Sequence, residues 1–439
     1  MKIAIIGGGA AGMSAASRAK KLNNDADVVV LEETRIVSHA PCGIPYYVSG
    51  YFSDERLFSA YDASQFEKIK GAHVKINTKV MEIRDGELVV NEGGRRGFIE
   101  YDKLIIATGA RPRLPNIPIN GDVLTVYHPA NAAMVKQRLW SARDIIIVGG
   151  GFLSIEMAEA LAGLGKRVTI ISRSNHLLSR VLDGDMSAIV ENKLRGAVDL
   201  VLGEEAVSVG LDINGRMVVE TSKGRYAGDS VVMATGIRPN SELAINAGLN
   251  VGGSGGIIVD DHMRTSKPDI YAAGDVVETV NAITGHRTIA PFGPIANKMG
   301  YVAGVNAAGG DMVFPGVVLT SITRFFDLKI GSTGVKEGDA IKLGLNPRTS
   351  IIKARTRSRY YPGGGLTWVK LVSDNKGKLI GGQVVGEEGV LARVNVIAVA
   401  VQHGLTIKDL FFAELGYLPP LSTAWDPLIM AARRLMPEG

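Results

Sequence analysis

Cysteine is almost missing from this chain, because Cys42 is the only one among 439 residues. A single thiol cannot form a disulfide within its own chain, which excludes a redox mechanism based on two cysteines. Any redox work by Cys42 therefore proceeds through a mixed disulfide, a persulfide or a sulfenic acid. A structural disulfide framework is excluded as well, which fits a reducing compartment and leads us to expect a cytoplasmic protein.

Long hydrophobic runs are also missing. No stretch approaches the ~18 apolar residues of a membrane span, and the first apolar run, residues 2–6, stops at a glycine too early for a signal peptide. We therefore expect no membrane segment. The formal net charge of +5 comes from scattered basic residues, so we expect small-molecule substrates, anionic ones included, and no nucleic-acid partner.

Glycine is abundant and is placed in a pattern. Residues 2–6 read as a buried strand, Gly7 to Gly12 as a tight turn, residues 13–22 as a helix and residues 28–31 as a second strand. Glu32 ends that strand about 20 residues after the last glycine, the spacing of a dinucleotide-binding βαβ unit. Glycines let backbone amides approach a pyrophosphate, and the carboxylate accepts hydrogen bonds from a ribose.

The same pattern occurs a second time. Residues 144–148 read as a strand, Gly149 to Ser154 as the turn, residues 155–164 as a helix and residues 168–171 as the next strand. Ser154 takes the third glycine position and is small enough to keep helix and strand close. Two such units in one chain predict two bound dinucleotides.

Three further segments end strands at glycine. Residues 104–112 and 231–239 are near copies that share Ala-Thr-Gly, and residues 265–275 end at Gly274-Asp275, whose carboxylate can reach a polyol hydroxyl. After about residue 316 the character changes to β-rich runs at 321–326, 367–372 and 378–385, followed by a helical stretch at 390–403. This part reads as a separate α+β domain.

In this order, the motifs resemble the pyridine nucleotide-disulfide oxidoreductases over nearly the whole chain. The resemblance implies an α/β fold with two Rossmann-like domains, for FAD and NAD(P), and a C-terminal α+β dimerisation domain that completes the active site of a partner in a homodimer. We expect the FAD domain at residues 1–112 and 241–316, the NAD(P) domain at 113–240 and the dimerisation domain at 317–439. No metal site is expected.

The segment from Ser38 to Tyr46, with Cys42 at its centre, is similar to the single-cysteine branch of that family, and most of all to its coenzyme A-disulfide reductases. His39 and Pro41 depart from the usual phenylalanine and asparagine. Peroxidases and oxidases of the branch carry a histidine where this chain has Ala10, which argues against a dedicated peroxide reductase, although His39 could substitute for it or simply pack beside the flavin domain.

The resemblance also implies the site residues. Those expected in catalysis are Cys42 with Tyr417 and either Tyr360 or Tyr361 of the partner. The residues expected to bind the cofactors are Gly7, Gly9, Ala10, Ala11, Gly12, Glu32, Glu33, Ala107, Thr108, Gly109, Gly149, Gly151, Phe152, Leu153, Ser172, Arg173, Gly236, Gly274 and Asp275. Those expected to bind coenzyme A (CoA) as substrate and product are Ser14, Arg18, Lys21, Ser38, Lys70 and Asn297.

Cofactor choice is read from the end of the second strand in the second βαβ unit. Enzymes that prefer NADH place an acid there, whereas this chain has Ser172 and Arg173. No carboxylate repels a 2′-phosphate at this point. We therefore expect NADPH to serve at least as well as NADH.

The leading hypothesis is an FAD-dependent NAD(P)H:CoA-disulfide reductase that forms a mixed disulfide between Cys42 and CoA. CoA persulfide or polysulfide is a second candidate acceptor, because the same thiolate would accept its sulfane sulfur. An NAD(P)H oxidase that makes hydrogen peroxide or water is the main alternative. A flavin redox sensor is a third reading, but the intact second nucleotide turn favours turnover.

Overall fold

The computed structural model describes residues 1–436, and the chain forms two compact units that are considered separately. The first unit contains residues 1–113, 126–136 and 237–317. The second unit contains residues 114–125, 137–236 and 318 onward.

The first unit is built on a five-stranded parallel sheet of order β18-β7-β1-β2-β3. Its strands are Ile270–Ala272, Lys103–Ile106, Lys2–Ile6, Asp27–Leu31 and His73–Lys75. Ile3, Ile5, Leu104 and Ile105 are completely buried, as expected for β-branched and aliphatic side chains in a parallel sheet covered on both faces. The carboxyl ends of parallel strands lie at one edge, so the residues that follow β1, β2, β7 and β18 meet there.

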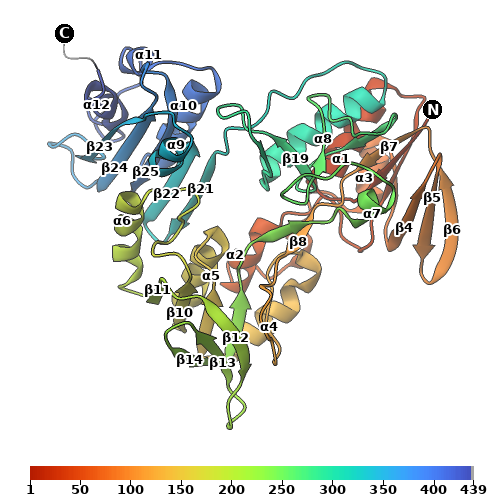
Figure 1. Ribbon diagram of the computed structural model, residues 1–439, viewed down its shortest axis with the longest axis horizontal. Helices are drawn as coiled ribbons and strands as arrows, with labels where there is room; N and C mark the ends of the chain where they lie inside the picture. Colours follow the sequence, from red (N-terminus) through yellow and green to blue (C-terminus); the bar gives the residue numbers. More distant parts are fainter. Residues whose placement is uncertain (437–439) are drawn as a thin grey trace. The chain divides into compact units, whose positions relative to one another are not determined.

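Helices α1 (Ala10–Leu22) and α8 (Gly293–Ala307) pack side by side in this unit (Figure 1). A Cβ at Gly300 would lie 2.1 Å from the Ala11 carbonyl oxygen, and one at Gly304 would lie 2.4 Å from that of Ala15, so glycine is required for this contact. α1 begins at Ala10, three residues before the predicted start at Met13. The reason is that Gly9 is the N-cap residue and its carbonyl accepts the Met13 N–H at 3.0 Å.

Shorter elements complete the first unit. A three-stranded antiparallel sheet is formed by β4 (Thr78–Arg84), β5 (Glu87–Glu92) and β6 (Arg95–Glu100). The other strands are β8 (Ala110–Pro112), β16 (Ile237–Pro239), β17 (Ile257–Ile258), β19 (Val277–Val280) and β20 (Arg287–Thr288). The helices are α2 (Ile44–Val48), α3 (Ala63–Lys70) and α7 (Glu242–Asn246), while α4 (Ala132–Ser141) runs across the boundary between the units.

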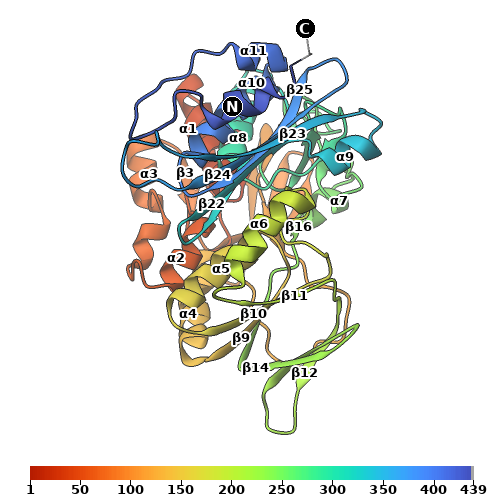
Figure 2. The same cartoon turned by 90° about the vertical axis from the view of Figure 1, so that its left-hand side faces the viewer.

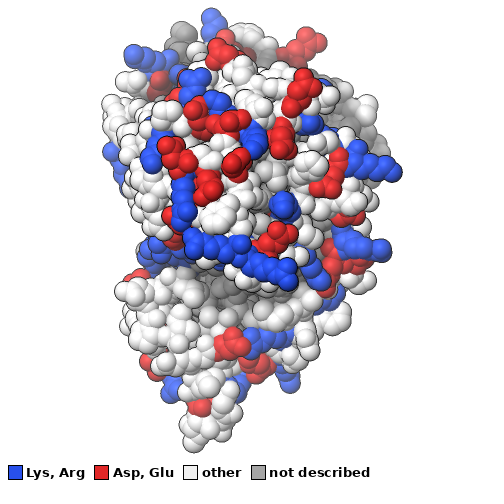
Figure 3. Space-filling model, turned by 90° about the vertical axis from the view of Figure 1, so that its right-hand side faces the viewer, with Lys and Arg blue, Asp and Glu red and all other residues white. Residues whose placement is uncertain are grey.

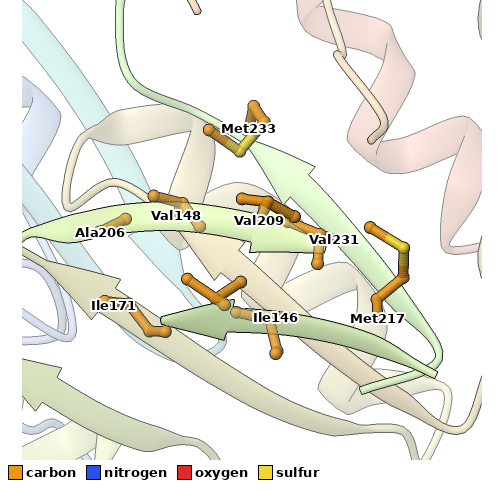
Figure 4. Packing of buried hydrophobic residues seen from close by; sticks show 9 residues of the cluster. Ile146, Val148, Ile171, Ala206, Val209, Met217, Val231 and Met233 are labelled. Atoms are coloured by element: carbon orange, nitrogen blue, oxygen red, sulfur yellow. The ribbon is translucent and has the colours of Figure 1, made fainter. Parts of the chain in front are cut away.

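The second unit begins with a parallel sheet of order β11-β10-β9-β15. These strands are Asp199–Leu202, Arg167–Ser172, Asp144–Val148 and Ser230–Met233, and the helices α5 (Phe152–Gly163) and α6 (Gly184–Leu194) accompany them. A three-stranded sheet, β12 (Ala206–Leu211), β13 (Met217–Thr221) and β14 (Arg225–Gly228), packs its Val209, Met217 and Val219 onto Ile146 and Val231 of the parallel sheet (Figure 4). This cluster forms the core of the second βαβ region.

The C-terminal part of the second unit is a five-stranded antiparallel sheet of order β21-β22-β25-β24-β23 (Figure 2). Its strands are Ser321–Phe325, Leu328–Gly334, Leu379–Gly386, Leu366–Ser373 and Arg348–Arg355, and its helices are α9 (Glu337–Lys342), α10 (Val390–Gln402), α11 (Ile407–Phe411) and α12 (Pro427–Arg433). Helix α10 packs on β22 and β25, and α12 packs on β23 and β24.

The predicted α/β class, with two parallel βαβ sheets and a C-terminal α+β domain, is confirmed. The three predicted domain boundaries stay a prediction, because the two compact units join the second βαβ region to the C-terminal sheet. Within residues 1–436, no helix combines the length and the apolar character that a membrane crossing requires.

Charged side chains of both signs are interspersed over most of the face seen in Figure 3. Exposed charged side chains of the first unit form pairs such as Lys2–Glu100 at 2.5 Å and Arg84–Glu82 at 3.0 Å. Exposed pairs of this kind contribute little to stability, because water and salt screen them. The stability of the chain therefore depends on its buried contacts.

One buried charged group stands out in the second unit. Lys370 on β24 is only 3% exposed, and its ammonium lies 2.7 Å from both Asp185 and Glu337 and 3.3 Å from Asp183. Asp183 also accepts hydrogen bonds from the Gly338 N–H at 3.0 Å and from Gln383 at 2.6 Å. This cluster ties the N-terminus of α6 to the C-terminal sheet.

Burial disfavours the charged form of both partners. For Lys370, hydrogen bonds to Asp185 and Glu337 outweigh burial and raise its pKa. For Asp183, the Gly338 N–H, Gln383 and Lys370 outweigh burial and lower its pKa. The contribution of Asp183 to stability is therefore present at neutral pH and is lost as the pH falls through its folded-state pKa.

Replacing Lys370 by methionine leaves the surrounding carboxylates without their cation. We expect Lys370→Met to lower the free energy of unfolding by about 3–5 kcal/mol, whereas Lys342→Met, at an exposed lysine 3.7 Å from Asp339, changes it by less than about 1 kcal/mol. Urea unfolding of both variants at neutral pH measures the difference. Equal effects of the two substitutions would contradict a stabilising role for the buried cluster.

Candidate functional site

The first glycine turn connects β1 to α1 in a conformation that excludes side chains. Gly7 has φ +105°, and a Cβ there would lie 2.3 Å from the Ala107 carbonyl oxygen. A Cβ at Gly12 would lie 1.9 Å from the Gly7 carbonyl oxygen. At Gly9 the nearest atom to a Cβ is His39 Nε2 at 3.7 Å, an ordinary van der Waals distance, so a Cβ would not clash there. Tight geometry at the two outer glycines and a less crowded middle glycine suit a pyrophosphate.

Glu32 is directed toward this turn. Its carboxylate is 7% exposed and accepts the Gly8 N–H at 2.8 Å and the Thr34 N–H at 2.7 Å. The neighbouring Glu33 is instead paired with Lys79 at 2.6 Å, where both side chains are more than half exposed. Of the two predicted acids, Glu32 is the one that contacts the turn.

The Ala-Thr-Gly segment after β7 lies at the same edge of the sheet. The Ala107 N–H donates to the Ile6 carbonyl at 2.8 Å, and Gly109 has φ +63°. Thr108 is fixed by a reciprocal pair of hydrogen bonds with Asn240, at 2.7 and 2.8 Å. The antiparallel pair β8–β16 therefore holds this segment beside the turn.

Gly274 and Asp275 follow β18 and complete this edge. A Cβ on Gly274 would lie 2.8 Å from that of Ala11, so the segment touches the start of α1. Within the described residues, Asp275 accepts one hydrogen bond, from the Tyr127 hydroxyl at 3.2 Å, and burial raises the pKa of this carboxyl. Tyr127 was not predicted. The local sequence does not indicate that Tyr127 belongs to the site, because its partner Asp275 lies 148 residues away in the chain.

Cys42 belongs to a loop that is hydrogen-bonded to the first turn. The Ser38 N–H donates to the Gly8 carbonyl at 2.8 Å, and Ser38 has φ +53°. Cys42 itself is exposed in a single 3-10 turn, Pro41–Gly43, that precedes α2. The Ala40 N–H bond to the Phe58 carbonyl, at 2.8 Å, fixes the other side of the loop. The only thiol of the chain is thus held near the first dinucleotide turn.

A cluster of aromatic side chains packs next to the loop that carries Cys42. Tyr47, Phe52 and Phe58 form a cluster with ring centroids 5.2–5.4 Å apart, and Lys136 lies 4.2 Å from the centroid of the Tyr47 ring. Buried aromatic pairs of this kind contribute packing energy beyond their area. This packing therefore helps to fix the position of the loop that carries Cys42.

His39 stands beside the turn as a neutral base. Its ring contacts His128 edge-on with centroids 4.4 Å apart, and its Nε2 atom is the atom nearest to a Cβ on Gly9. Burial first, and His128 second, lower the pKa of His39 to about 4. Its buried Nδ1 atom has no hydrogen-bond partner among residues 1–436. His128, like Tyr127, comes from the 126–136 segment and was not predicted.

Three of the predicted CoA residues meet where α1 packs on α8. The Ser14 hydroxyl donates to Asn297 at 2.7 Å, and one turn further along, the Arg18 guanidinium lies 4.6 Å from the centroid of the Tyr301 ring. The buried Nε atom of Arg18 has no hydrogen-bond partner within the described part of the chain. Tyr301 was not predicted, although its i+4 spacing from Asn297 matches that of Arg18 from Ser14.

The other predicted CoA residues lie apart from this junction. Lys21 is exposed at the end of α1, and Lys70 ends α3 with its ammonium 5.7 Å from the centroid of the Tyr61 ring. Ser38 lies in the cysteine loop. Ser14 and Asn297 contact each other, and Arg18 contacts Tyr301 at the same helix junction, whereas Lys21, Lys70 and Ser38 take no part in these contacts.

The second glycine turn, in the second unit, repeats the geometry of the first. Gly149 has φ +132°, and a Cβ there would lie 2.2 Å from the Ala234 carbonyl oxygen. No atom lies within 4 Å of a Cβ on Gly151, so space remains at the start of α5, where Phe152 and Leu153 follow. Gly236 ends the second Ala-Thr-Gly segment with φ +107°. This turn also fits a dinucleotide.

The end of β10 carries the residues expected to select the nucleotide. Ser172 is buried, and its hydroxyl would lie 2.7 Å from a Cβ on Gly150. Arg173 is 73% exposed and lies 3.8 Å from Glu205, which is similarly exposed. This loose, solvent-screened pair leaves the guanidinium available to a ligand.

The predicted tyrosines gather on two loops of the C-terminal domain. The hydroxyls of Tyr360 and Tyr417 are 3.0 Å apart, and Ser358 lies 3.1 Å from Tyr417. Tyr361 lies next to them in the chain and is less exposed than Tyr360. The structure thus pairs Tyr360, rather than Tyr361, with Tyr417.

Comparison with known proteins agrees with this geometry. The family model described as pyridine nucleotide-disulphide oxidoreductase matches residues 1–293, and that of its dimerisation domain matches residues 320–428. A solved structure of an NAD-dependent persulfide reductase from A. fulgidus superposes with a TM-score of 0.95 at 38% identity, covering 99% of this chain and 83% of that one.

Curated relatives match the chain from end to end. An NAD(P)H sulfur oxidoreductase (CoA-dependent) of Pyrococcus furiosus is 45% identical, and 99% of each chain is covered. An NADH oxidase of Methanocaldococcus jannaschii is 32% identical and a coenzyme A disulfide reductase of Staphylococcus aureus is 27% identical, each with 98% of both chains covered. The chain therefore belongs to the pyridine nucleotide-disulphide oxidoreductases, a family of enzymes that use FAD and NAD(P)H.

Proposed function

We propose that this chain is an FAD-dependent NAD(P)H oxidoreductase that reduces the disulfide of CoA, and the persulfide of CoA, through a covalent adduct on Cys42. The observation that carries the proposal is the hydrogen bond between Ser38 and Gly8, because it fixes the loop of the only cysteine to the first dinucleotide turn. The CoA-dependent and persulfide-reducing relatives support the choice of substrate.

The first unit has the features that FAD requires. Gly7, Gly9 and Gly12, with Ala10 and Ala11, would surround its pyrophosphate, Glu32 would accept its ribose hydroxyls, and Ala107, Thr108 and Gly109 would line the flavin side. Asp275 is a partly buried carboxylate that accepts a single hydrogen bond within residues 1–436, so it retains an acceptor for a polyol hydroxyl. When bound, FAD would supply the two electrons that convert a cysteine-bound disulfide back to thiols.

Cys42 would act as the nucleophile. Its thiolate attacks one sulfur of CoA disulfide, the disulfide bond breaks, and a new bond joins Cys42 to one CoA while the other leaves as a thiolate that takes up one proton. With CoA persulfide, attack on the outer sulfur releases CoA thiolate and leaves the persulfide on Cys42. The exposed position of Cys42 gives both substrates access.

The junction of α1 and α8 is the proposed CoA site. CoA carries a pyrophosphate and a 3′-phosphate, and the unpartnered Nε of Arg18 offers a charged donor for such a group. Tyr301 offers an aromatic face for the adenine, and Ser14 and Asn297 offer polar groups beside it. Lys21, Lys70 and Ser38 would contribute as more distant contacts.

The dimer and its location are also proposals. The C-terminal domain exposes large apolar side chains such as Phe412 at 68% and Leu421 at 70%, which supports a homodimer that buries them. Tyr417 and Tyr360 would then complete the cysteine site of the partner subunit. We place the FAD domain at 1–112 and 241–316, the NAD(P) domain at 113–240 and the dimerisation domain at 317–439, and we assign the protein to the cytoplasm.

An NAD(P)H oxidase is the second candidate. Its support is the related NADH oxidase together with His39, whose neutral ring stands beside Gly9, next to the position of the oxidase histidine, which Ala10 occupies here. Steady-state rates with CoA disulfide, CoA persulfide, peroxide and oxygen would rank the two functions. A rate with oxygen that exceeds the rates with the CoA substrates would favour the oxidase.

The role of Cys42 can be separated from that of the flavin. We expect Cys42→Ser to lower the rate of CoA-disulfide reduction by at least about 10³-fold, because the nucleophile is removed, while reduction of FAD by NADPH stays unchanged. Stopped-flow absorbance of the flavin and a steady-state assay measure the two rates. Ser49→Ala, in the same segment, serves as the control. A Cys42→Ser enzyme that still reduces CoA disulfide would contradict the mechanism.

Tyr127 is expected to hold Asp275 in place for FAD. Tyr127→Phe removes one hydrogen bond from a partly buried carboxylate, so we expect FAD to bind about tenfold more weakly. Tyr101→Phe is the matched control, because its hydroxyl donates to the Arg84 carbonyl at 2.7 Å, away from Asp275 in the sequence and in its bonding. Flavin fluorescence during dilution of the two variants measures the dissociation constant. Equal affinities would rule out the role.

Arg173 is expected to bind the 2′-phosphate of NADPH. Arg173→Ala should raise the KM for NADPH by about tenfold and leave the KM for NADH nearly unchanged, because only NADPH carries the extra phosphate. Arg225→Ala, at an exposed arginine on β14, is the control. A parent enzyme that strongly prefers NADH, or a variant that loses both nucleotides equally, would contradict this assignment.

A further inference from the structure

Three hydroxyl groups in the C-terminal domain form a continuous hydrogen-bonded chain. Tyr360 and Tyr417 are 3.0 Å apart, Tyr417 and Ser358 are 3.1 Å apart, and the Ser358 hydroxyl donates to the Ser422 carbonyl at 3.3 Å. The outer end, Tyr360, is 75% exposed, whereas Ser358 is buried. This series of hydrogen bonds thus runs from the surface to the Ser422 carbonyl inside the domain.

The bond from Ser358 to the Ser422 carbonyl determines which way the three hydroxyl protons point in the resting enzyme. A carbonyl oxygen can only accept, so the single proton of Ser358 is used toward Ser422. Ser358 then accepts the proton of Tyr417, and Tyr417 accepts that of Tyr360. At rest every proton points inward, and Tyr360 has no proton to offer to a sulfur anion at the surface.

The backbone around Ser358 is firmly held. Its N–H donates to the Pro419 carbonyl at 3.2 Å, which joins the two loops that carry the tyrosines. Ser422 is anchored in turn, because its hydroxyl lies 3.0 Å from Asp426, which is paired with the buried Arg393 at 2.8 Å. The hydrogen bond between Ser358 and Ser422 is the longest in this series, and breaking it therefore requires the least energy.

We propose that Ser358 is a positioning residue that controls proton delivery through these hydrogen-bonded hydroxyls, because its own hydroxyl can turn from the Ser422 carbonyl to Tyr417. When it turns, Tyr417 donates to Tyr360, and the Tyr360 proton points outward. This inference rests on the proposed function, in which Tyr360 and Tyr417 serve the cysteine site of the partner subunit.

The proton count balances at each step. The CoA thiolate released by attack of Cys42 takes the proton of Tyr360, Tyr360 regains a proton from Tyr417, and Tyr417 is left as an anion. The hydroxyls of Ser358 and Tyr360 then both donate to Tyr417. Because Tyr417 is 47% exposed, solvent can return its proton.

The directions in which the pKa values of the two tyrosines are shifted agree with this order of proton transfer. Hydrogen bonds from Ser358, and then from Tyr360, lower the pKa of Tyr417, while the bond to Tyr417 raises the pKa of Tyr360. Tyr417 is therefore the one that ionises first. Tyr417 lines a hollow of about 270 Å³ whose charged lining residues are Glu414 and Asp426. Arg357 on the neighbouring loop is held by Glu388 at 2.5 Å.

The test compares Ser358→Ala with Ser358→Thr, which keeps the hydroxyl. NMR titration of protein carrying tyrosine labelled at Cζ, with Tyr417→Phe to assign the signal, follows the ionisation of Tyr417. We expect a clear rise in the pKa of Tyr417 in Ser358→Ala and little change in Ser358→Thr. Ser373→Ala is the control, because that buried hydroxyl in the same domain donates to the Arg348 carbonyl and has no tyrosine partner among residues 1–436.

A kinetic readout accompanies the titration. We expect kcat for CoA-disulfide reduction to fall about tenfold in Ser358→Ala, with KM for CoA disulfide and flavin reduction by NADPH unchanged. An unchanged Tyr417 titration in a folded Ser358→Ala protein would overturn the inference. A parent enzyme without CoA-disulfide activity but with the titration shift would overturn the proposed function and leave the control of Tyr417 by Ser358 standing.

Discussion

The hydrogen bond from the Ser38 N–H to the Gly8 carbonyl is the contact on which the rest of the site depends. It requires a first turn without side chains, because Val37 lies 2.7 Å from the position of a Cβ on Gly8. It also requires the left-handed conformation of Ser38, which redirects the chain toward Cys42. Through this contact the loop that carries Cys42 is tied to the first glycine turn.

The two nucleotide turns use the same steric principle with one difference. At the third position, Gly12 admits no Cβ at all, whereas Ser154 is tolerated in the second turn as a fully buried residue. The first turn is therefore the tighter of the two, and it is the one that adjoins the cysteine loop. The Lys370 cluster attaches the second βαβ region to the C-terminal sheet.

Glycine patterns made much of this site predictable from sequence. The two turns, Glu32, the Gly274-Asp275 segment and the strands around them follow from steric rules that act over a few residues, and the structure confirms their local geometry. Tyr127, His128, Tyr301 and Ser358 were missed because each acquires its partner through tertiary folding. The contacts of Tyr127 with Asp275 and of Ser358 with Tyr417 span 148 and 59 residues, and no periodic pattern links their positions.

The central claim is that Cys42 carries CoA during turnover, and peptide mass spectrometry tests it most directly. The enzyme is purified without added thiols, and the peptide that contains Cys42 is analysed before and after anaerobic addition of NADPH. The account predicts a CoA adduct on Cys42 that NADPH removes. A sulfinic acid without CoA, or an adduct that persists after NADPH has reduced the flavin, would contradict it.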